Sequence, residues 1–258
     1  MSRSERAAPP RLRQPGEVAM TWLIAQRAAT EALHDRLSLV VGLFFALVLP
    51  LGVLLVAVRP LAAVTGGDAE PALGAALAFY LLMVGLLPAL SAVGIAAGLF
   101  AGEKERGILT PLLASPASNL AIFGGKVLGA VIPPLAYAVV AEAVYVIGLA
   151  VLLGPTRLRL LPSPLTAATV VLVPALTCFA AIVASLISSR VRTFNTAQQL
   201  GGLVLMPLWG LIFGLAVKLQ DWGPAGLFGV VVGLLLLDGA LTALAAATWR
   251  REEVLSHR

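Results

Sequence analysis

The chain has 258 residues, of which 59% are hydrophobic and only 12% are charged, and its net charge is +5. A soluble domain carries about 25% charged residues, so this composition excludes an ordinary soluble protein and indicates an integral membrane protein. The single cysteine excludes an internal disulfide, and we expect no nucleic-acid partner because the basic residues are distributed over loops between apolar runs.

The N-terminal part of the chain has two sections. Residues 1–17 are rich in Pro and Arg and are predicted to form a flexible cytoplasmic tail. Residues 18–37 carry polar side chains at three- and four-residue spacing, with apolar side chains on the other face. This pattern predicts an amphipathic helix at the membrane interface, and a surface helix of a soluble domain is the alternative. The residues that mark the interfacial helix are Trp22, Arg27, Glu31 and His34.

Six long apolar runs follow, within residues 38–248. At about 1.5 Å per residue, each can cross a hydrocarbon core of about 30 Å with modest tilt or thinning. The chain is therefore predicted to be an all-α integral membrane protein with six transmembrane helices. The spans are placed at about 38–58, 72–100, 127–153, 165–187, 200–217 and 225–248, with a loop at 101–126 and a tail at 249–258.

The orientation follows from the lysine and arginine residues. Fourteen lie on the side that holds both termini and the 101–126 loop, and four lie on the other side. Since cytoplasmic loops carry the excess of basic residues, we expect both termini, the loop and the two tails to be cytoplasmic. The loops on the other side are short, so the 101–126 loop is the main feature that can meet a soluble partner.

Several kinds of catalytic site are excluded. The two histidines, His34 and His257, lie outside the predicted spans, so neither an intramembrane metalloprotease nor a Ser–His protease can be built. The Gly124-Gly125-Lys126 sequence lacks the first glycine and the Ser or Thr of an ATP-binding P-loop. We therefore expect no enzyme activity, no catalytic residue, no metal site and no cofactor in this chain.

Two acidic residues, Glu142 and Asp238, fall inside predicted spans. An ionisable group at membrane depth is costly and marks a candidate functional site. These residues could bind a cation, relay protons, or make structural hydrogen bonds between helices. Together with Tyr137 and Tyr145 they are candidates for a translocation path, although both tyrosines are also suited to simple packing.

Glycine pairs at four-residue spacing occur in three spans, at Gly94/Gly98, Gly210/Gly214 and Gly229/Gly233. Such pairs let helices approach closely. Gly210 and Gly214 are candidates for helix packing or for a dimer contact, and the spacing alone favours neither.

The sequence "AGEKERGILTPLLASPASNLAIFGGK", residues 101–126, separates the second and third spans. It opens with four consecutive charges, continues as an apolar segment too short to cross a membrane, and breaks at Ser115-Pro116. Ser118 or Asn119 can cap the helix that follows, and Lys126 is expected to lie at the cytoplasmic interface. The pattern fits a short docking helix parallel to the membrane or a solvated loop that only fixes topology.

This loop resembles the cytoplasmic signature of the ABC-2 type transporter permeases, which runs approximately EKE-x-GT-L-E-x-LL-x-SP-x-S and then GK. The chain departs from it at Ile108 and Thr110. The matching residues are Glu103, Lys104, Glu105, Gly107, Leu109, Leu112, Leu113, Ser115, Pro116, Ser118, Gly125 and Lys126.

The resemblance implies the membrane subunit of an ATP-binding-cassette exporter. ABC ATPase subunits would bind ATP and Mg, and the permease would pair with a second copy of itself or a related permease among the lipids of a bacterial or archaeal plasma membrane. The 103–116 segment would be the coupling helix, and the helix at 18–37 would also touch the ATPase. The coupling residues would be Glu103, Lys104, Glu105, Arg106, Gly107, Leu109, Leu112, Leu113, Ser115 and Pro116.

Two other functions stay open at this point. One is an ion-coupled secondary transporter that uses Glu142 or Asp238, and the other is a membrane scaffold without transport. The sequence does not identify the substrate, which could be a drug, lipid, peptide, glycan or sodium.

Overall fold

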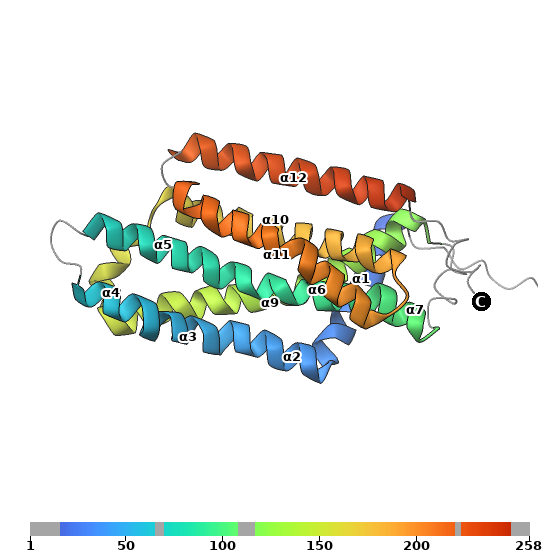
Figure 1. The fold of residues 1–258 in the computed structure, drawn as a ribbon, viewed down its shortest axis with the longest axis horizontal. Coiled ribbons are helices and arrows are strands. Elements are labelled where there is room, and N and C mark those ends of the chain that lie inside the picture. Colours follow the sequence, from blue (N-terminus) through green and yellow to red (C-terminus); the bar gives the residue numbers. More distant parts are fainter. Residues whose placement is uncertain (1–15, 65–69, 108–116, 220–222, 249–258) are drawn as a thin grey trace, which may run out of the picture.

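A computed structural model describes residues 16–64, 70–107, 117–219 and 223–248, and within these ranges it contains helices and no strand (Figure 1). Among the described residues, five helices are long and apolar enough to cross a membrane. The chain is therefore a multi-pass, all-helical membrane protein, as predicted. The five helices are Arg36–Val64, Glu70–Glu105, Asn119–Leu153, Pro164–Arg190 and Gly223–Ala245.

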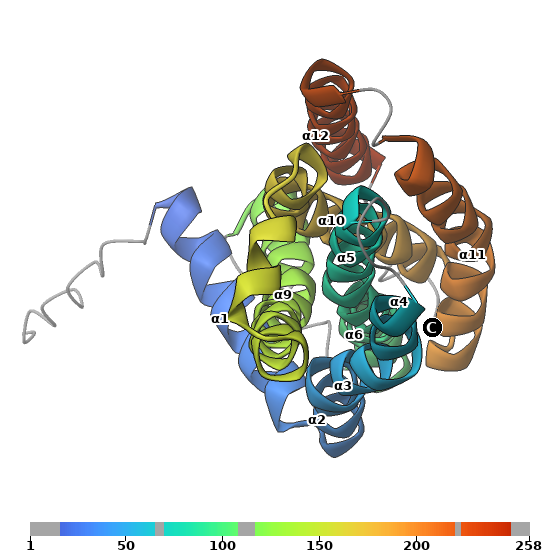
Figure 2. The ribbon, with the colours of Figure 1, turned by 90° about the vertical axis from the view of Figure 1, so that its left-hand side faces the viewer.

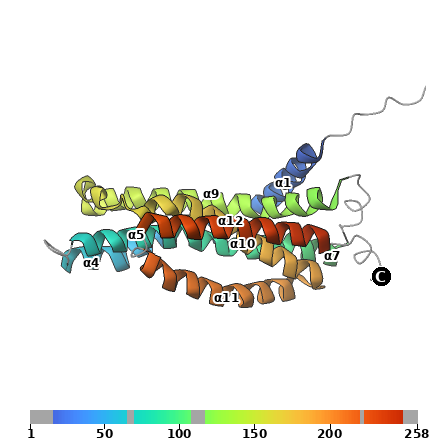
Figure 3. The same ribbon diagram turned by 90° about the horizontal axis from the view of Figure 1, so that it is seen from above.

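The helix at the N-terminus ends earlier than expected. Helix α1 covers Glu17–His34, and Asp35 then begins helix α2, Arg36–Leu43. The Asp35 carboxylate accepts a hydrogen bond from the Ser38 amide at 2.9 Å, which is the N-cap that starts a new helix. Because the chain turns at this cap, α1 leaves the end of the bundle at an angle (Figure 3).

The first two long helices contain irregular turns. The first consists of α2, α3 (Leu49–Val53) and α4 (Arg59–Val64), joined by π turns at Phe44–Val48 and Leu54–Val58. The second consists of α5 (Glu70–Leu86), α6 (Leu90–Ala97) and α7 (Glu103–Glu105), joined by a 3₁₀ turn at Leu87–Ala89 and a π turn at Gly98–Gly102. Pro50 and Pro88 lie beside or within these turns, since proline cannot donate the helical hydrogen bond.

The remaining helices are long and regular. They are α9 (Asn119–Leu153), α10 (Pro164–Arg190), α11 (Phe194–Leu219) and α12 (Gly223–Thr248), with a 3₁₀ helix at Pro155–Leu160 between α9 and α10. Ser118 caps α9 by accepting a hydrogen bond from the Ala121 amide, which confirms the predicted cap. Ser163 caps α10 in the same way, and Gly154 ends α9 with a φ of +86°.

Helices α5, α6, α9 and α10 form the centre of the bundle, while α12 lies outside α10 (Figure 2). The main core includes Leu82, Leu86, Val131, Leu172 and Ala181, all buried. Large apolar side chains that remain exposed, such as Val56 at 78% and Leu236 at 69%, fit contact with lipid tails. Helices α6, α9 and α10 pack against one another in this centre. The four consecutive charged residues Glu103, Lys104, Glu105 and Arg106, called the charged segment from here on, follow the π turn after α6.

Small residues join α1 to α9. Four alanines of α1 are buried, and Ala25 and Ala28 lie against Gly129 of α9, while Thr21 and Ile24 lie against Gly125. A Cβ atom at Gly125 would lie 2.8 Å from the Thr21 carbonyl oxygen, and one at Gly129 would collide with Ala28. The two backbones are therefore as close as small-residue packing permits.

Candidate functional site

The charged segment after α6 begins with a buried ion pair. Lys126 Nζ lies 2.7 Å from Glu103 Oε2, and the two side chains are 2% and 13% exposed. Lys126 also donates to the Leu99 carbonyl oxygen at 2.6 Å, and its ammonium lies 5.1 Å from the centre of the Phe100 ring. Glu103 and Lys126 therefore face each other inside the protein, and Glu103 is not part of a solvated charge cluster. The end of one long helix and the start of the next are near enough for the two charges to neutralise each other.

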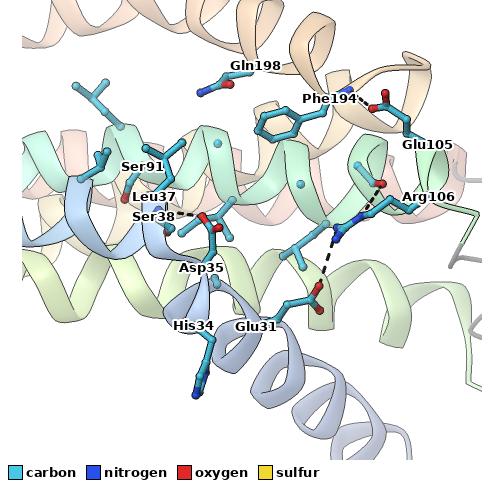
Figure 4. Close-up of a pocket in the computed structure, with 18 of the residues that line it drawn as sticks. Glu31, His34, Asp35, Leu37, Ser38, Ser91, Glu105, Arg106, Phe194 and Gln198 are labelled. Atoms are coloured by element: carbon cyan, nitrogen blue, oxygen red, sulfur yellow. Dashed lines mark hydrogen bonds and ion pairs between the residues drawn. The ribbon is translucent and has the colours of Figure 1, made fainter.

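The next acidic side chain reaches a different helix. Glu105 Oε2 accepts a hydrogen bond from the backbone amide of Phe194 at 3.0 Å, at the first residue of α11. The first amides of a helix have no partner inside that helix, and its N-terminus favours a negative charge. Glu105 therefore anchors the start of α11 to the charged segment (Figure 4).

The remaining charges of the segment are less constrained. Arg106 donates through Nε to the Gly102 carbonyl oxygen at 3.1 Å, and its guanidinium lies 4.0 Å from Glu31 of α1. Both partners of this ion pair are about half exposed, so it contributes little stability. The Lys104 side chain has no hydrogen bond or ion pair among the described residues. Gly107, with a φ of +70°, ends the segment in a conformation that favours glycine.

A serine on α10 holds the π turn just before this segment. Ser188 Oγ accepts a hydrogen bond from the Ala101 amide at 2.9 Å and lies 3.3 Å from the Ala97 carbonyl oxygen, to which it donates. In an α-helix that amide and that carbonyl would bond to each other, so the fully buried Ser188 hydroxyl stands between them. The Ser188 contact therefore helps to set the direction in which the chain leaves the π turn.

A cavity of about 790 Å³ opens beside the charged segment (Figure 4). Its walls come from the α1–α2 corner, from α6 with the π turn, and from the start of α11. The charged groups in its lining are Glu31, Asp35, Glu105 and Arg106, so the charged segment forms one rim of the cavity. The His34 ring Nδ1 is 2.7 Å from the Thr30 carbonyl oxygen, and the ring points away from the other labelled residues.

The candidate translocation-path residues do not gather at this cavity. Glu142 lies at the crossing of α9, α5 and α10, where a Cβ atom at Gly85 would collide with its Oε1. Glu142 Oε1 has no hydrogen-bond partner among the described residues, and neither Asp238 carboxylate oxygen has one. Tyr145 donates to the Leu77 carbonyl oxygen at 3.1 Å, and the Tyr137 ring packs against Gly42. The tyrosines thus pack helices together.

Other predicted site residues lie elsewhere or outside the described ranges. Trp22 is 53% exposed and Arg27 is exposed, both on α1. Gly210 and Gly214 are exposed on α11, and a Cβ atom at either would meet nothing within 4 Å. The coupling residues outside the described ranges are Leu109, Leu112, Leu113, Ser115 and Pro116.

Sequence reasoning missed three features of this region: the cap on α11, the Ser188 contact and the cavity. One signal was available for the ion pair, since Glu103 comes just after the end of one predicted span and Lys126 just before the next, so both lie on the same side of the membrane. Comparison with models of known protein families and with curated protein sequences finds no match.

Proposed function

We propose that the chain is the membrane subunit of an ATP-driven exporter, with separate ATPase subunits supplying the energy. The observation that carries the proposal is the set of contacts made by the charged segment. Its side chains reach α9 through Glu103, α11 through Glu105 and α1 through Arg106. A push on this segment by a soluble partner would act on the helices that these contacts join, most directly on α9 through the buried pair. The resemblance of residues 103–126 to the ABC-2 permease signature supports the same function.

The proposal includes the parts that the resemblance implies. The permease has six spans, with α11 as the fifth, and both termini are cytoplasmic. It works in a bacterial or archaeal plasma membrane as a dimer with itself or with a related permease, and ATP and Mg are bound by the ATPase partner. The distribution of Lys and Arg supports this orientation.

Co-purification tests the proposal. The tagged chain is extracted gently from its native membrane, and we expect a nucleotide-hydrolysing subunit to accompany it in stoichiometric amount. Lys104→Glu should weaken this association, because Lys104 has no hydrogen bond or ion pair within the described chain and can serve a partner. Arg59→Glu, at an exposed position near the opposite end of the bundle, is the matched control. A chain that purifies alone would contradict the proposal.

An ion-coupled secondary transporter is the second candidate, and one observation favours it. Glu142 Oε1 and both oxygens of the largely buried Asp238 have no hydrogen-bond partner among the described residues. Carboxyl groups at membrane depth whose oxygens have no hydrogen-bond partner are candidates for cation or proton binding. This function predicts transport by the reconstituted chain alone, driven by a proton or sodium gradient and abolished by Glu142→Gln or Asp238→Asn.

A further inference from the structure

The lining of the cavity beside the charged segment has two chemically different parts. One part is apolar and includes Val41, Phe45, Leu90 and Ile95. The rim carries three carboxylates and one guanidinium, Glu31, Asp35, Glu105 and Arg106, a net charge of about −2. Small-molecule sites have volumes of about 300–1,000 Å³, with apolar walls and a few polar groups that set orientation. The 790 Å³ cavity fits that description.

One wall of the cavity is bare backbone. Gly94, Gly98 and Gly102 lie at four-residue spacing along α6 and the π turn, and all three line the cavity. Among the described residues and within 4 Å, a Cβ atom at Gly94 would meet only the Gln198 amide nitrogen at 3.7 Å, and one at Gly98 only the Phe194 ring at 3.9 Å. There is therefore room at this wall for a bulky apolar group.

The polar groups of the mouth are not fully used by the protein. Asp35 accepts the Ser38 amide through Oδ2, and among the described residues the Glu31 side chain has only the 4.0 Å contact with Arg106. A positively charged guest would meet two carboxylates with unused acceptor capacity, whereas an anion would meet a net negative rim.

We propose that this cavity binds a monovalent organic cation with a bulky apolar body, and that such a cation is the cargo. The apolar body lies against the glycine wall and Phe45, and the cationic centre lies near Asp35 and Glu31. The statement that this cation is the cargo rests on the proposed export function, whereas the statement that the cavity binds the cation does not. The cavity faces α2 and α11, whose exposed apolar side chains fit lipid, so a guest dissolved in the membrane has a route to it.

A pair of ions with the same shape and opposite charge tests the proposal. Binding of tetraphenylphosphonium and of tetraphenylborate is measured by equilibrium dialysis with the chain in neutral phosphatidylcholine nanodiscs, and empty nanodiscs are subtracted. We expect the cation to bind at least about tenfold more tightly, a difference of about 1.4 kcal/mol. Equal binding of the two ions, or tighter binding of the anion, overturns the proposal.

Two sets of variants locate the binding. Glu31→Gln with Asp35→Asn removes two rim charges and keeps the α2 cap, because Asn also caps helices. It should weaken cation binding at least about tenfold, whereas Glu17→Gln with Glu70→Gln, outside the cavity, should change it less than about twofold. If both double variants bind the cation as the wild type does, the rim does not recognise charge and the proposal fails.

The second set fills the space. Gly94→Leu places a side chain in the cavity and should abolish saturable cation binding, while Gly229→Leu on α12 has nothing within 4 Å and should not. The oligomeric state of each variant is measured as well, from the size of the protein particle. A wild-type chain that binds neither ion and loses its dimer on Gly94→Leu would assign the cavity to a second copy and overturn the proposal.

The outcomes for cargo and for function are separable. Cation binding without any ATPase in the co-purification leaves the site intact and refutes the exporter. A stoichiometric ATPase with no cation binding, and no stimulation of its hydrolysis by tetraphenylphosphonium, refutes the cargo and leaves the exporter.

Discussion

The buried pair of Glu103 and Lys126 gives a quantitative prediction about stability. Glu103→Ala removes the carboxylate and leaves the ammonium of Lys126, a residue that is 2% exposed, whose remaining partners among the described residues are the Leu99 carbonyl oxygen and the Phe100 ring. Removing one partner of a buried pair costs about 3–5 kcal/mol, because the other charge stays buried without compensation. We expect a loss of about 3 kcal/mol, near the low end of that range, because the carbonyl and the ring still stabilise the ammonium.

The double variant separates the cost of the pair from the cost of either residue. Lys126→Met keeps an apolar chain of similar length and leaves Glu103, which can turn toward water because it is 13% exposed. The double variant Glu103→Ala with Lys126→Met removes both charges. It should therefore lose less free energy of unfolding than Glu103→Ala alone, by at least about 1 kcal/mol. The free energy of unfolding is measured by circular dichroism on detergent-solubilised protein titrated with denaturant. If the two single losses simply add to give the double loss, the pair is not coupled and the reasoning is refuted.

Three further predictions concern the contacts around the charged segment and the core, each measured by the same unfolding titration. Ser188→Ala should cost about 1–3 kcal/mol, because it leaves a buried amide of the π turn without an acceptor; a loss below about 0.5 kcal/mol would contradict this. Glu105→Ala should lower the free energy of unfolding by about 0.5–2 kcal/mol, because the contact at the start of α11 is lost. Arg106→Ala should lower it by no more than about 1 kcal/mol, and a larger loss for Arg106→Ala than for Glu105→Ala would contradict this prediction. Gly85→Ala should destabilise by about 1–3 kcal/mol through its collision with Glu142, and the loss should shrink in a Glu142→Ala background.

The long helices were predictable because their signal is local. Apolar runs of about 20 residues dictate spans whatever their partners, and the cap at Ser118 depends only on a side chain and an amide three residues later. The helix at 18–37 was predicted from its pattern, but its end was not. Asp35 followed by Ser38 is a capping arrangement, and it interrupts the helix at His34.

The charged segment was harder to predict because its contacts join residues far apart in sequence. Four consecutive charges suggest solvent exposure, and for Arg106 that is correct. Glu103 is instead largely buried, with its side chain 13% exposed, because Lys126 lies 23 residues later near the start of the next long helix. The Ser188 contact spans 87 residues and occupies a gap that only the packed helices create. The cavity likewise depends on the bend at Asp35, which sets α1 at an angle to α2.

The contacts of the charged segment differ in strength, and the difference matters for the proposed coupling. The pair with Lys126 is buried and resists separation, while the contact with Glu31 is half exposed and contributes at most about 1 kcal/mol. A force on this segment would therefore carry α9 with it and break the contact with α1 first. Both Glu31 and Arg106 line the cavity, so the weakest contact lies at its mouth. In the proposed exporter, the same movement that a partner imposes on the charged segment would change access to the cation site without disturbing the core.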